Sequence, residues 1–352
     1  MLRFKSIFEI IFSTLIYYSG LNWLYTKIIA AKRNIPIIFY HEIGNEALSD
    51  FSVRVNNFDK QIQWLSRHYN IVPIDKVVKH IKGEIKLPGK VAAVSFDGGY
   101  VGNFKYAYPI LKKYNVPATI YIVTNSVDGN IPWERMLLYI ILLTKKEQLT
   151  LEFKGQSCTF KIKTRGQKRA VKFKIQAYMT ELNNEEKKKL LQQLSKKLNV
   201  DLSNFVQQLF LSWDQIREMN KDPLITIGSH SLSHARLTDI SINDAAKEII
   251  ESKKRIESEL GEEITSFCYP DGCVSEEIKL LVKNAGYSSG LAVSTPGVLS
   301  DLNKIGDDVF ELRRIQMPDR FYIPLIATEL SGIMRILKNT MKLIYTKIRR
   351  IA

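Results

Sequence analysis

An acidic residue followed by two glycines is the first feature of this sequence that could carry out chemistry. The stretch VSFDGGY places Asp97 after a short apolar run, and Gly98 and Gly99 separate it from Tyr100. Residues 91–96 suit a buried strand, and the carboxyl ends of parallel strands open into the ligand crevice of a sheet. Asp97 is therefore a candidate catalytic group, with the capping of an ordinary turn as the alternative.

Two histidines follow another apolar segment. In the stretch GSHSLSH, His230 and His234 come directly after the strand-like LITIG. A spacing of four residues lets both imidazoles face one atom if a helical turn begins there, and imidazole nitrogen is a common zinc ligand. The pattern predicts a metal site, although such a pair also arises by chance.

Two later segments also contain residues that could take part in a site. The stretch FCYPDG, 267–272, runs from strand-like residues into a tight turn whose backbone N–H groups can donate to an oxyanion. The stretch ELRRI contains Arg313 and Arg314, which face either a pocket or solvent. An isolated turn or arginine pair does not indicate a function by itself, so its interpretation depends on the strands and helices around it.

These segments belong to a regular alternation of strand-like and helix-like stretches. The alternation starts near residue 35, and it returns after residue 210. Strands that alternate with helices of this length predict parallel βα units, and hence a barrel or a doubly wound sheet. Residues 128–210 break the rhythm with a helix, strands around glycine-containing turns and a charged amphipathic helix, which predicts an insertion of α+β type.

Composition narrows the classes of protein. The chain has 352 residues, 45% of them hydrophobic and 25% charged, which suits a large globular domain with an insertion. The three cysteines form no CxxC pair, so neither a disulfide framework nor a structural zinc site is expected. The net charge of +15 is spread along the chain without a nucleic-acid module, which leaves a solvated surface or attraction to an anionic membrane or polysaccharide.

The two ends of the chain are amphipathic. Residues 1–33 hold a basic start, the apolar segment Ile7 to Tyr18 and several aromatic residues, and residues 321–352 predict a basic amphipathic helix. We expect both ends to associate with a membrane surface without spanning it, on a side that the sequence leaves open. The alternative for residues 1–33 is a helix that packs on the protein's own core.

The order of strand-Asp, strand-His-x-x-x-His and strand-Tyr-Pro-x-Gly resembles the polysaccharide deacetylases, the NodB-homology family of carbohydrate esterases. The resemblance runs from Ile35 to Met317 and includes IPIIFYH, LPGKVAAVSFDGGY, IGSHSLSHARL and FCYPDG. It implies an α/β fold with a distorted seven-stranded (β/α) barrel. Residues 34–127 and 211–320 would form this barrel, and residues 128–210 the inserted α+β subdomain.

The family pattern also implies roles for single residues. Its first motif reads Thr-Phe-Asp-Asp-Gly, in which the first aspartate is the general base and the second binds a divalent metal, usually zinc. Asp97 matches the base, His230 and His234 match the two metal imidazoles, and Gly98 stands where the metal-binding aspartate is expected. The zinc site is therefore expected to be weakened, and Gly98→Asp to repair it, because the motif spacing leaves room for the side chain.

Other positions follow the family less closely. The resemblance places the backbone N–H of Asp271 at the oxyanion, after Pro270 in the turn. The late Leu-x-His that supplies a general acid has no match, because no histidine follows His234. His41, at the end of the first strand, is the candidate substitute.

The substrate side of the site is expected to hold four residues. Tyr100 and Tyr269 are expected to shape the acetyl pocket, and Pro270 and Arg314 to contact substrate. The resemblance implies a metal-dependent hydrolase that removes acetyl groups from N-acetylated sugars of a surface polysaccharide or its lipid-linked oligosaccharide precursor, with no nucleic-acid partner. The alternative is a catalytically silent, carbohydrate-binding member of the family, which the glycine at position 98 favours.

Overall fold

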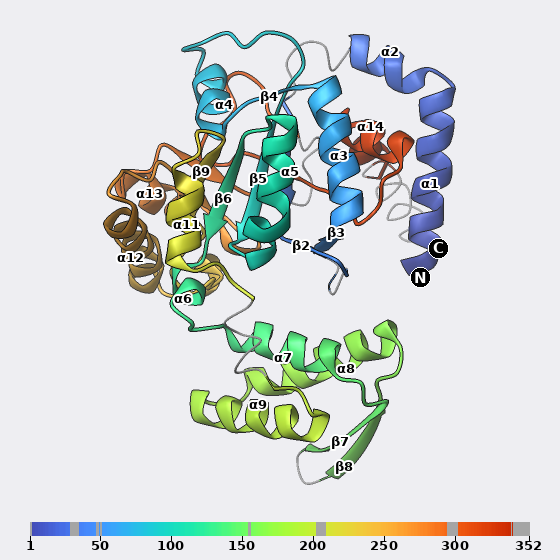
Figure 1. Cartoon of the computed structure of the whole chain (residues 1–352), viewed down its shortest axis with the longest axis vertical. Coiled ribbons are helices and arrows are strands. Elements are labelled where there is room, and N and C mark those ends of the chain that lie inside the picture. The colour runs from blue at the N-terminus through green and yellow to red at the C-terminus, as the bar shows by residue number, and fades with distance from the viewer. Residues whose placement is uncertain are drawn as a thin grey trace, which may run out of the picture. The chain divides into compact units, whose positions relative to one another are not determined.

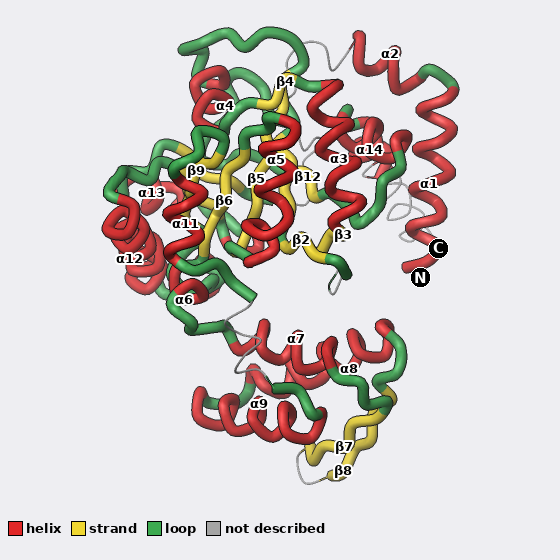
Figure 2. Tube along the Cα trace, viewed as in Figure 1, coloured by secondary structure: helices red, strands yellow, loops and turns green. Residues whose placement is uncertain are grey.

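The computed structural model describes residues 2–28, 35–46, 49, 51–153, 156–201, 209–293, 302–338 and 340. The chain divides into two units, one formed by residues 1–127 and 211–352 and the other by residues 128–210. A parallel sheet forms the centre of the first unit (Figures 1 and 2).

The sheet has the strand order β11-β10-β9-β6-β5-β1-β12, and β4 pairs with the start of β5. The strands are β1 (Ile37–Tyr40), β4 (Asn70–Ile71), β5 (Val91–Gly98), β6 (Ala118–Ile122), β9 (Ile225–Ser229), β10 (Ser266–Cys268), β11 (Ser289–Leu291) and β12 (Ile315–Gln316). All the described pairings in this sheet are parallel. The predicted α/β fold is confirmed as a curled parallel half-barrel with seven strands along its main path.

Burial explains why the strands read as continuous apolar runs. All eight residues of β5 and all five of β6 are buried, as is typical of a parallel sheet whose two faces are both covered. The first-unit helices that follow or precede these strands are α3 (Val55–His68), α4 (Ile74–Ile81), α5 (Tyr108–Tyr114), α6 (Thr124–Val127), α11 (Trp213–Asn220), α12 (Ile242–Leu260) and α13 (Glu276–Asn284). The short strands β2 (Glu42–Gly44) and β3 (Ser52–Arg54) form a separate pair.

In helix α12 the local sequence explains where the helix begins, where it ends and which face is buried. The Ser241 side chain accepts a hydrogen bond from the N–H of Asp244 at the start, and Gly261 ends the helix with a φ of 71°. Between them, Ala245, Ile249 and other apolar residues at helical spacing are buried. The helix therefore lies with one apolar face on the core.

The described residues of the second unit form three helices and a hairpin. The unit contains α7 (Trp133–Leu143), the antiparallel strands β7 (Gln148–Phe153) and β8 (Gln156–Lys161), α8 (Arg165–Thr180) and α9 (Asn184–Leu198). Capping boxes begin α8 at Thr164 and α9 at Asn183. Helix α7 packs against both α8 and α9.

The first described helix of the chain, α1 (Leu2–Tyr18), lies against α14 (Ile323–Leu330) in the first unit. Helix α2 (Leu21–Ile28) follows α1. The hydroxyls of Thr14 and Tyr322 lie 2.6 Å apart. The Lys338 ammonium lies 3.1 Å from a carboxylate oxygen of Glu9. Polar contacts of this kind fix the terminal helices to each other.

The prediction that both ends associate with a membrane is therefore wrong. None of the described helices is long and apolar enough to cross a membrane, and α1 is docked on α14 of the chain's own fold. This is the alternative considered for residues 1–33. Of the predicted C-terminal helix, residues 341–352 lie outside the described part of the chain.

Candidate active site

Three strands bring the chemically competent residues together. Asp97 lies near the end of β5, His230 directly follows β9, and Cys268 ends β10. Ligand atoms of these three buried residues all lie within 4.8 Å of one another. The ring of His234 lies 4.8 Å from that of His230, centroid to centroid. The aspartate and the two histidines, far apart in sequence, thus share one site.

A buried ion pair fixes the carboxylate. The Arg314 guanidinium donates to both oxygens of Asp97, at 2.7 and 2.8 Å, and both side chains are almost fully buried. The same guanidinium lies 3.1 Å from the Cys268 sulfur and 4.5 Å from the centre of the Phe39 ring. Two parallel hydrogen bonds of this kind set both the position and the orientation of a carboxylate.

Arg314 therefore lies elsewhere than expected. It is only 2% exposed and binds Asp97, so its guanidinium positions the carboxylate and offers no surface to a polysaccharide. The sequence showed two consecutive arginines without a sign of which one faces inward. Along an extended segment neighbouring side chains point to opposite sides, and the segment before β12 turns Arg314 into the sheet.

The electrostatics favour an ionised aspartate beside a neutral imidazole. Burial alone would raise the pKa of Asp97, but the charge of Arg314, followed by smaller contributions that include His230 and His41, holds that pKa well below its usual range. Burial lowers the pKa of His230, against the charge of Asp97. Asp97 is thus ionised across the physiological pH range.

His41 belongs to the same site. It follows β1, and its ring packs against Phe39 and Phe51, with centroids 5.6 and 4.9 Å away. Its contribution to the lowered pKa of Asp97 places it within electrostatic reach of the carboxylate. The position fits the general-acid role considered from the sequence.

The turn after β10 divides the remaining predicted residues. Asp271 has a φ of 55°, and its exposed carboxylate accepts a hydrogen bond from Arg236 at 3.2 Å. Pro270 is buried within the turn, so it lacks the surface needed for the substrate contact expected of it. Tyr269 is fully buried, and its hydroxyl donates to the carbonyl oxygen of Phe310 at 2.8 Å. Tyr269 is a core residue and does not have the surface needed to shape an acetyl pocket.

The space beside Gly98 is already filled. Gly98 has a φ of 92°, and a Cβ built on it would lie 2.8 Å from Cε2 of the Tyr100 ring. Tyr100 is itself 3% exposed, which leaves the ring little room to move. The expectation that position 98 has room for an aspartate is wrong, because neither the backbone angle nor the position of the tyrosine can be read from motif spacing.

Gly98→Asp is expected to lower the free energy of unfolding by about 1 to 3 kcal/mol through the left-handed backbone, with a further loss from contact with Tyr100. Thermal denaturation with and without zinc would measure both the loss and any rescue by metal. We expect tighter zinc binding only in the double variant Gly98→Asp/Tyr100→Ala.

Gly306→Asp is the matched control, because Gly306 has a φ of 85° and nothing within 4 Å of a built Cβ. It carries the backbone cost alone. If Gly98→Asp were no less stable than Gly306→Asp, the tyrosine would not obstruct position 98.

A divalent cation fits these residues in part. The Nδ1 atom of His230 lies 2.8 Å from the carbonyl oxygen of Cys268, which leaves Nε2 as a ligand atom, and His234 adjoins it. Both oxygens of Asp97 are held by Arg314, and burial raises the pKa of the Cys268 thiol well above its usual value. The described residues thus offer two imidazoles and no uncommitted carboxylate, which suits a weak site.

Comparisons with known proteins all find polysaccharide deacetylases. A family model described as polysaccharide deacetylase matches residues 84–290. YxkH of Bacillus subtilis, a protein named for the same family, is 22% identical over 269 residues, which are 76% of this chain and 66% of that protein. A poly-beta-1,6-N-acetyl-D-glucosamine N-deacetylase of Staphylococcus epidermidis is 32% identical over 87 residues, which are 24% of this chain and 30% of that protein. The matches thus span less than two thirds of either relative.

A solved structure agrees on the fold. The Streptococcus pyogenes deacetylase PplD in complex with acetate superposes with a TM-score of 0.56 at 16% sequence identity, and the match covers 84% of this chain and 98% of that one. At this identity the likeness concerns the arrangement of the elements alone.

Proposed function

This chain belongs to the polysaccharide deacetylase family, and from that premise we propose that it hydrolyses the acetamide groups of N-acetylated sugars in a polysaccharide. The observation that carries the proposal is the buried carboxylate of Asp97, held by Arg314 beside His230. The named activity of the Staphylococcus epidermidis relative makes β-1,6-linked N-acetylglucosamine the first substrate to test.

The proposed reaction uses Asp97 as general base. Its carboxylate accepts a proton from water as the water oxygen attacks the acetyl carbon, and the backbone N–H of Asp271 donates to the developing oxyanion. The carbon–nitrogen bond then breaks, a proton passes to the sugar nitrogen, and acetate leaves. His41 is the group proposed to supply that proton.

His230 and His234 would hold a divalent cation, most simply zinc. When bound, such a cation polarises a carbonyl and lowers the pKa of a water. The tie between His230 and the Cys268 carbonyl fixes the ring orientation needed to offer Nε2. Arg314 keeps Asp97 oriented and ionised, which reserves the carboxylate for proton transfer.

The second candidate is a silent member of the family that binds glycan without cleaving it. Gly98 and the Tyr100 ring beside it favour this candidate, because together they remove the anionic metal ligand and occupy its place. Both candidates use the same site around Asp97, and they differ in whether acetate is released.

The test is to incubate the full chain with β-1,6-linked N-acetylglucosamine oligomers and, as a comparison, with β-1,4-linked oligomers, with zinc in excess or a chelator present. Mass spectrometry follows the loss of acetyl groups, and calorimetry follows binding. We expect deacetylation of the β-1,6 series that the chelator suppresses. Binding without deacetylation would favour the silent candidate, and neither binding nor deacetylation in either series would contradict both.

A further inference from the structure

A cavity lies at the opposite end of the sheet from Asp97. Its volume is about 830 Å³, and its wall includes Ile35, just before β1, and Val91, the first residue of β5. Asp97 lies six residue steps along the extended strand from Val91, a distance of about 20 Å. The cavity is therefore separate from the candidate active site.

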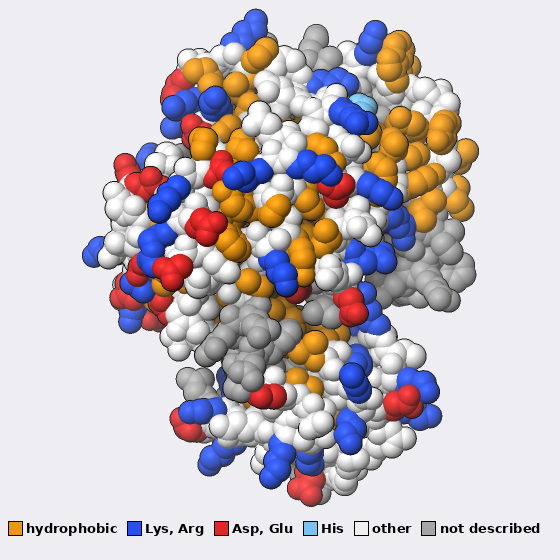
Figure 3. Space-filling view, in the orientation of Figure 1, with side chains coloured by type: hydrophobic (Ala, Val, Ile, Leu, Met, Phe, Trp, Pro, Cys, Tyr) orange, Lys and Arg blue, Asp and Glu red, His pale blue; other side chains and the backbone are white. Residues whose placement is uncertain are grey.

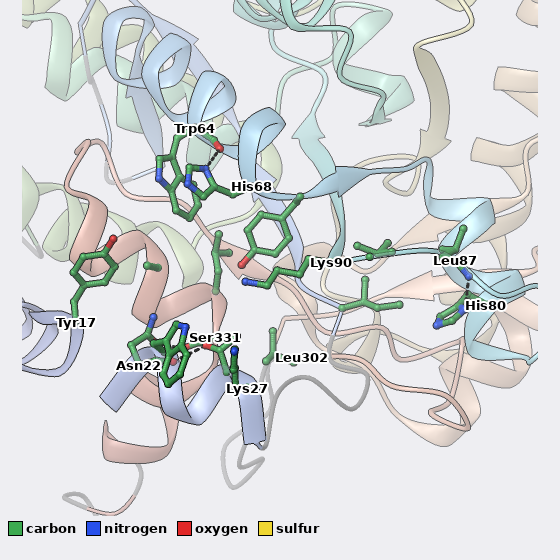
Figure 4. A pocket seen from close by; sticks show the side chains of 18 residues that line it. Tyr17, Asn22, Lys27, Trp64, His68, His80, Leu87, Lys90, Leu302 and Ser331 are labelled. Carbon is green, nitrogen blue, oxygen red and sulfur yellow. Dashed lines mark hydrogen bonds between the residues drawn. The ribbon is translucent and has the colours of Figure 1, made fainter. Parts of the chain in front are cut away.

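Three parts of the first unit form the wall: the helices α1 and α2, the segment before β5 with the end of α3, and α14 (Figure 4). Four aromatic residues line it: Tyr17, Trp23, Trp64 and Tyr69. Aliphatic side chains, among them Leu302 and Leu330, complete the apolar surface. A volume and lining of this kind suit a small molecule with a large apolar part.

The charged groups of the wall have one sign. Of the 18 lining residues, two are lysines and two are histidines, and none is an aspartate or a glutamate. Figure 4 shows Lys27, from α2, and Lys90, from the segment before β5, on facing sides of the cavity. Cations without a carboxylate nearby favour an anionic group on the ligand.

The other polar groups are largely committed to one another. The Ser331 hydroxyl donates to the side-chain oxygen of Asn22 at 2.7 Å, and the ring of His68 stacks on Trp64 with centroids 4.3 Å apart. The ammonium group of Lys27 lies 4.5 Å from the centre of the Trp23 ring. The Lys27 amine thus lies beside aromatic surface, where it can pair with the charged end of a ligand whose apolar part packs on the rings.

The apolar surface continues outside the cavity. Figure 3 shows hydrophobic side chains gathered over α1 and α2. Its exposed members there are Ile11, Leu15, Tyr18, Leu21, Trp23, Leu24 and Ile28. A contiguous exposed apolar patch beside a cavity is typical of a ligand-binding or interaction site.

We propose that this cavity binds an anionic amphiphile, a molecule with one aliphatic chain that ends in a phosphate or a carboxylate. The chain packs against the aromatic and aliphatic wall, and the anionic end pairs with Lys27 and Lys90. The two lysines disfavour a deacetylated glycan because they would repel its protonated amines. A neutral sugar is disfavoured because it would pair with neither lysine charge. The proposal is independent of the reaction at Asp97.

Octyl phosphate, below its micelle concentration, is the probe for isothermal titration calorimetry on the full chain, with octanoate, octanol and glycerol phosphate as comparison ligands. We expect binding of octyl phosphate and octanoate, and binding about tenfold weaker or worse for the two ligands that lack either the charge or the chain. Equal affinity for octanol, or no binding of octyl phosphate, would overturn the proposal.

Two variants locate the binding. Lys27→Gln/Lys90→Gln should weaken octyl phosphate binding by about tenfold or more, whereas the matched control Lys60→Gln/Lys79→Gln, which removes two exposed charges outside the wall, should not. Ala327→Phe, which adds a ring inside the cavity, should abolish binding. Thermal denaturation checks that each variant is folded. Unchanged affinity in folded Ala327→Phe, or equal losses in the two double variants, would place the binding elsewhere and overturn the proposal.

Discussion

Replacing Asp97 with asparagine is expected to lower kcat/KM for acetate release by about 10²- to 10⁴-fold, the range that a positioned general base contributes. The amide has nearly the shape of the carboxylate, so the substitution removes the proton acceptor with little change of volume. The rate is measured with saturating zinc on β-1,6-linked N-acetylglucosamine oligomers. It is normalised to the folded fraction, because Arg314 loses its buried counter-charge in this variant.

Asp59→Asn serves as the control, since Asp59 pairs with Lys113 on the surface of α3. It should retain wild-type kcat/KM. A folded Asp97→Asn protein that keeps most of the wild-type rate would show that another group deprotonates the water.

The second large effect concerns the buried ion pair. Arg314→Met should lower the free energy of unfolding at pH 7 by about 3 to 5 kcal/mol, because it leaves the carboxylate of Asp97 buried without a partner. Chemical denaturation measures the loss. The partly exposed Arg217, which pairs with Asp214 and Glu259, is the matched control, and Arg217→Met should cost less than about 1 kcal/mol.

The loss in Arg314→Met should depend on pH in a defined direction. In the wild type, the folded-state pKa of Asp97 lies below the unfolded value, so the pair stabilises the protein above about pH 4 and loses this effect as the pH falls further. Without Arg314, burial raises the folded-state pKa, and the variant loses stability as the pH rises through that value. The difference between the two proteins should therefore be larger at pH 8 than near pH 4, because over this range only the variant loses stability. A difference independent of pH would mean that the loss comes from packing.

The double variant Asp97→Leu/Arg314→Met distinguishes the cost of an unpaired buried charge from the cost of losing the packing contacts of Arg314. Replacing a buried ion pair by apolar residues of similar volume is often neutral or stabilising. We expect the double variant to recover most of the stability that Arg314→Met loses, without any acetate release. A double variant as unstable as Arg314→Met would assign the loss to the missing guanidinium contacts rather than to the unpaired carboxylate.

The sequence predicts the fold class well because strands that are buried on both faces of a parallel sheet appear in it as continuous apolar runs. The apolar runs that end at Asp97 and before His230 are buried strands, and their carboxyl ends meet at one edge of the sheet. The position of each motif at the end of a strand therefore predicts that this aspartate and this histidine lie close together, although more than a hundred residues separate them.

Features that depend on a distant partner could not be read in the same way. The amphipathic N-terminal segment has the same pattern whether its apolar face meets lipid or α14, about 300 residues away. The tyrosine of FCYPDG follows a strand, as a pocket residue would, but its hydroxyl reaches Phe310 in the core. Motif spacing likewise gives no backbone angle, so the obstruction of Gly98 by Tyr100 appears only in three dimensions.

The central claim is that this chain hydrolyses acetamide groups with Asp97 as the base, and ¹⁸O labelling tests it most directly. The full chain is incubated with zinc and β-1,6-linked N-acetylglucosamine oligomers in water enriched in ¹⁸O, and the acetate is examined by mass spectrometry. The account predicts acetate that carries one ¹⁸O atom from the attacking water, formed by the wild type and nearly absent with Asp97→Asn. Glycan that binds the folded wild type but yields no labelled acetate above the Asp97→Asn background would contradict it.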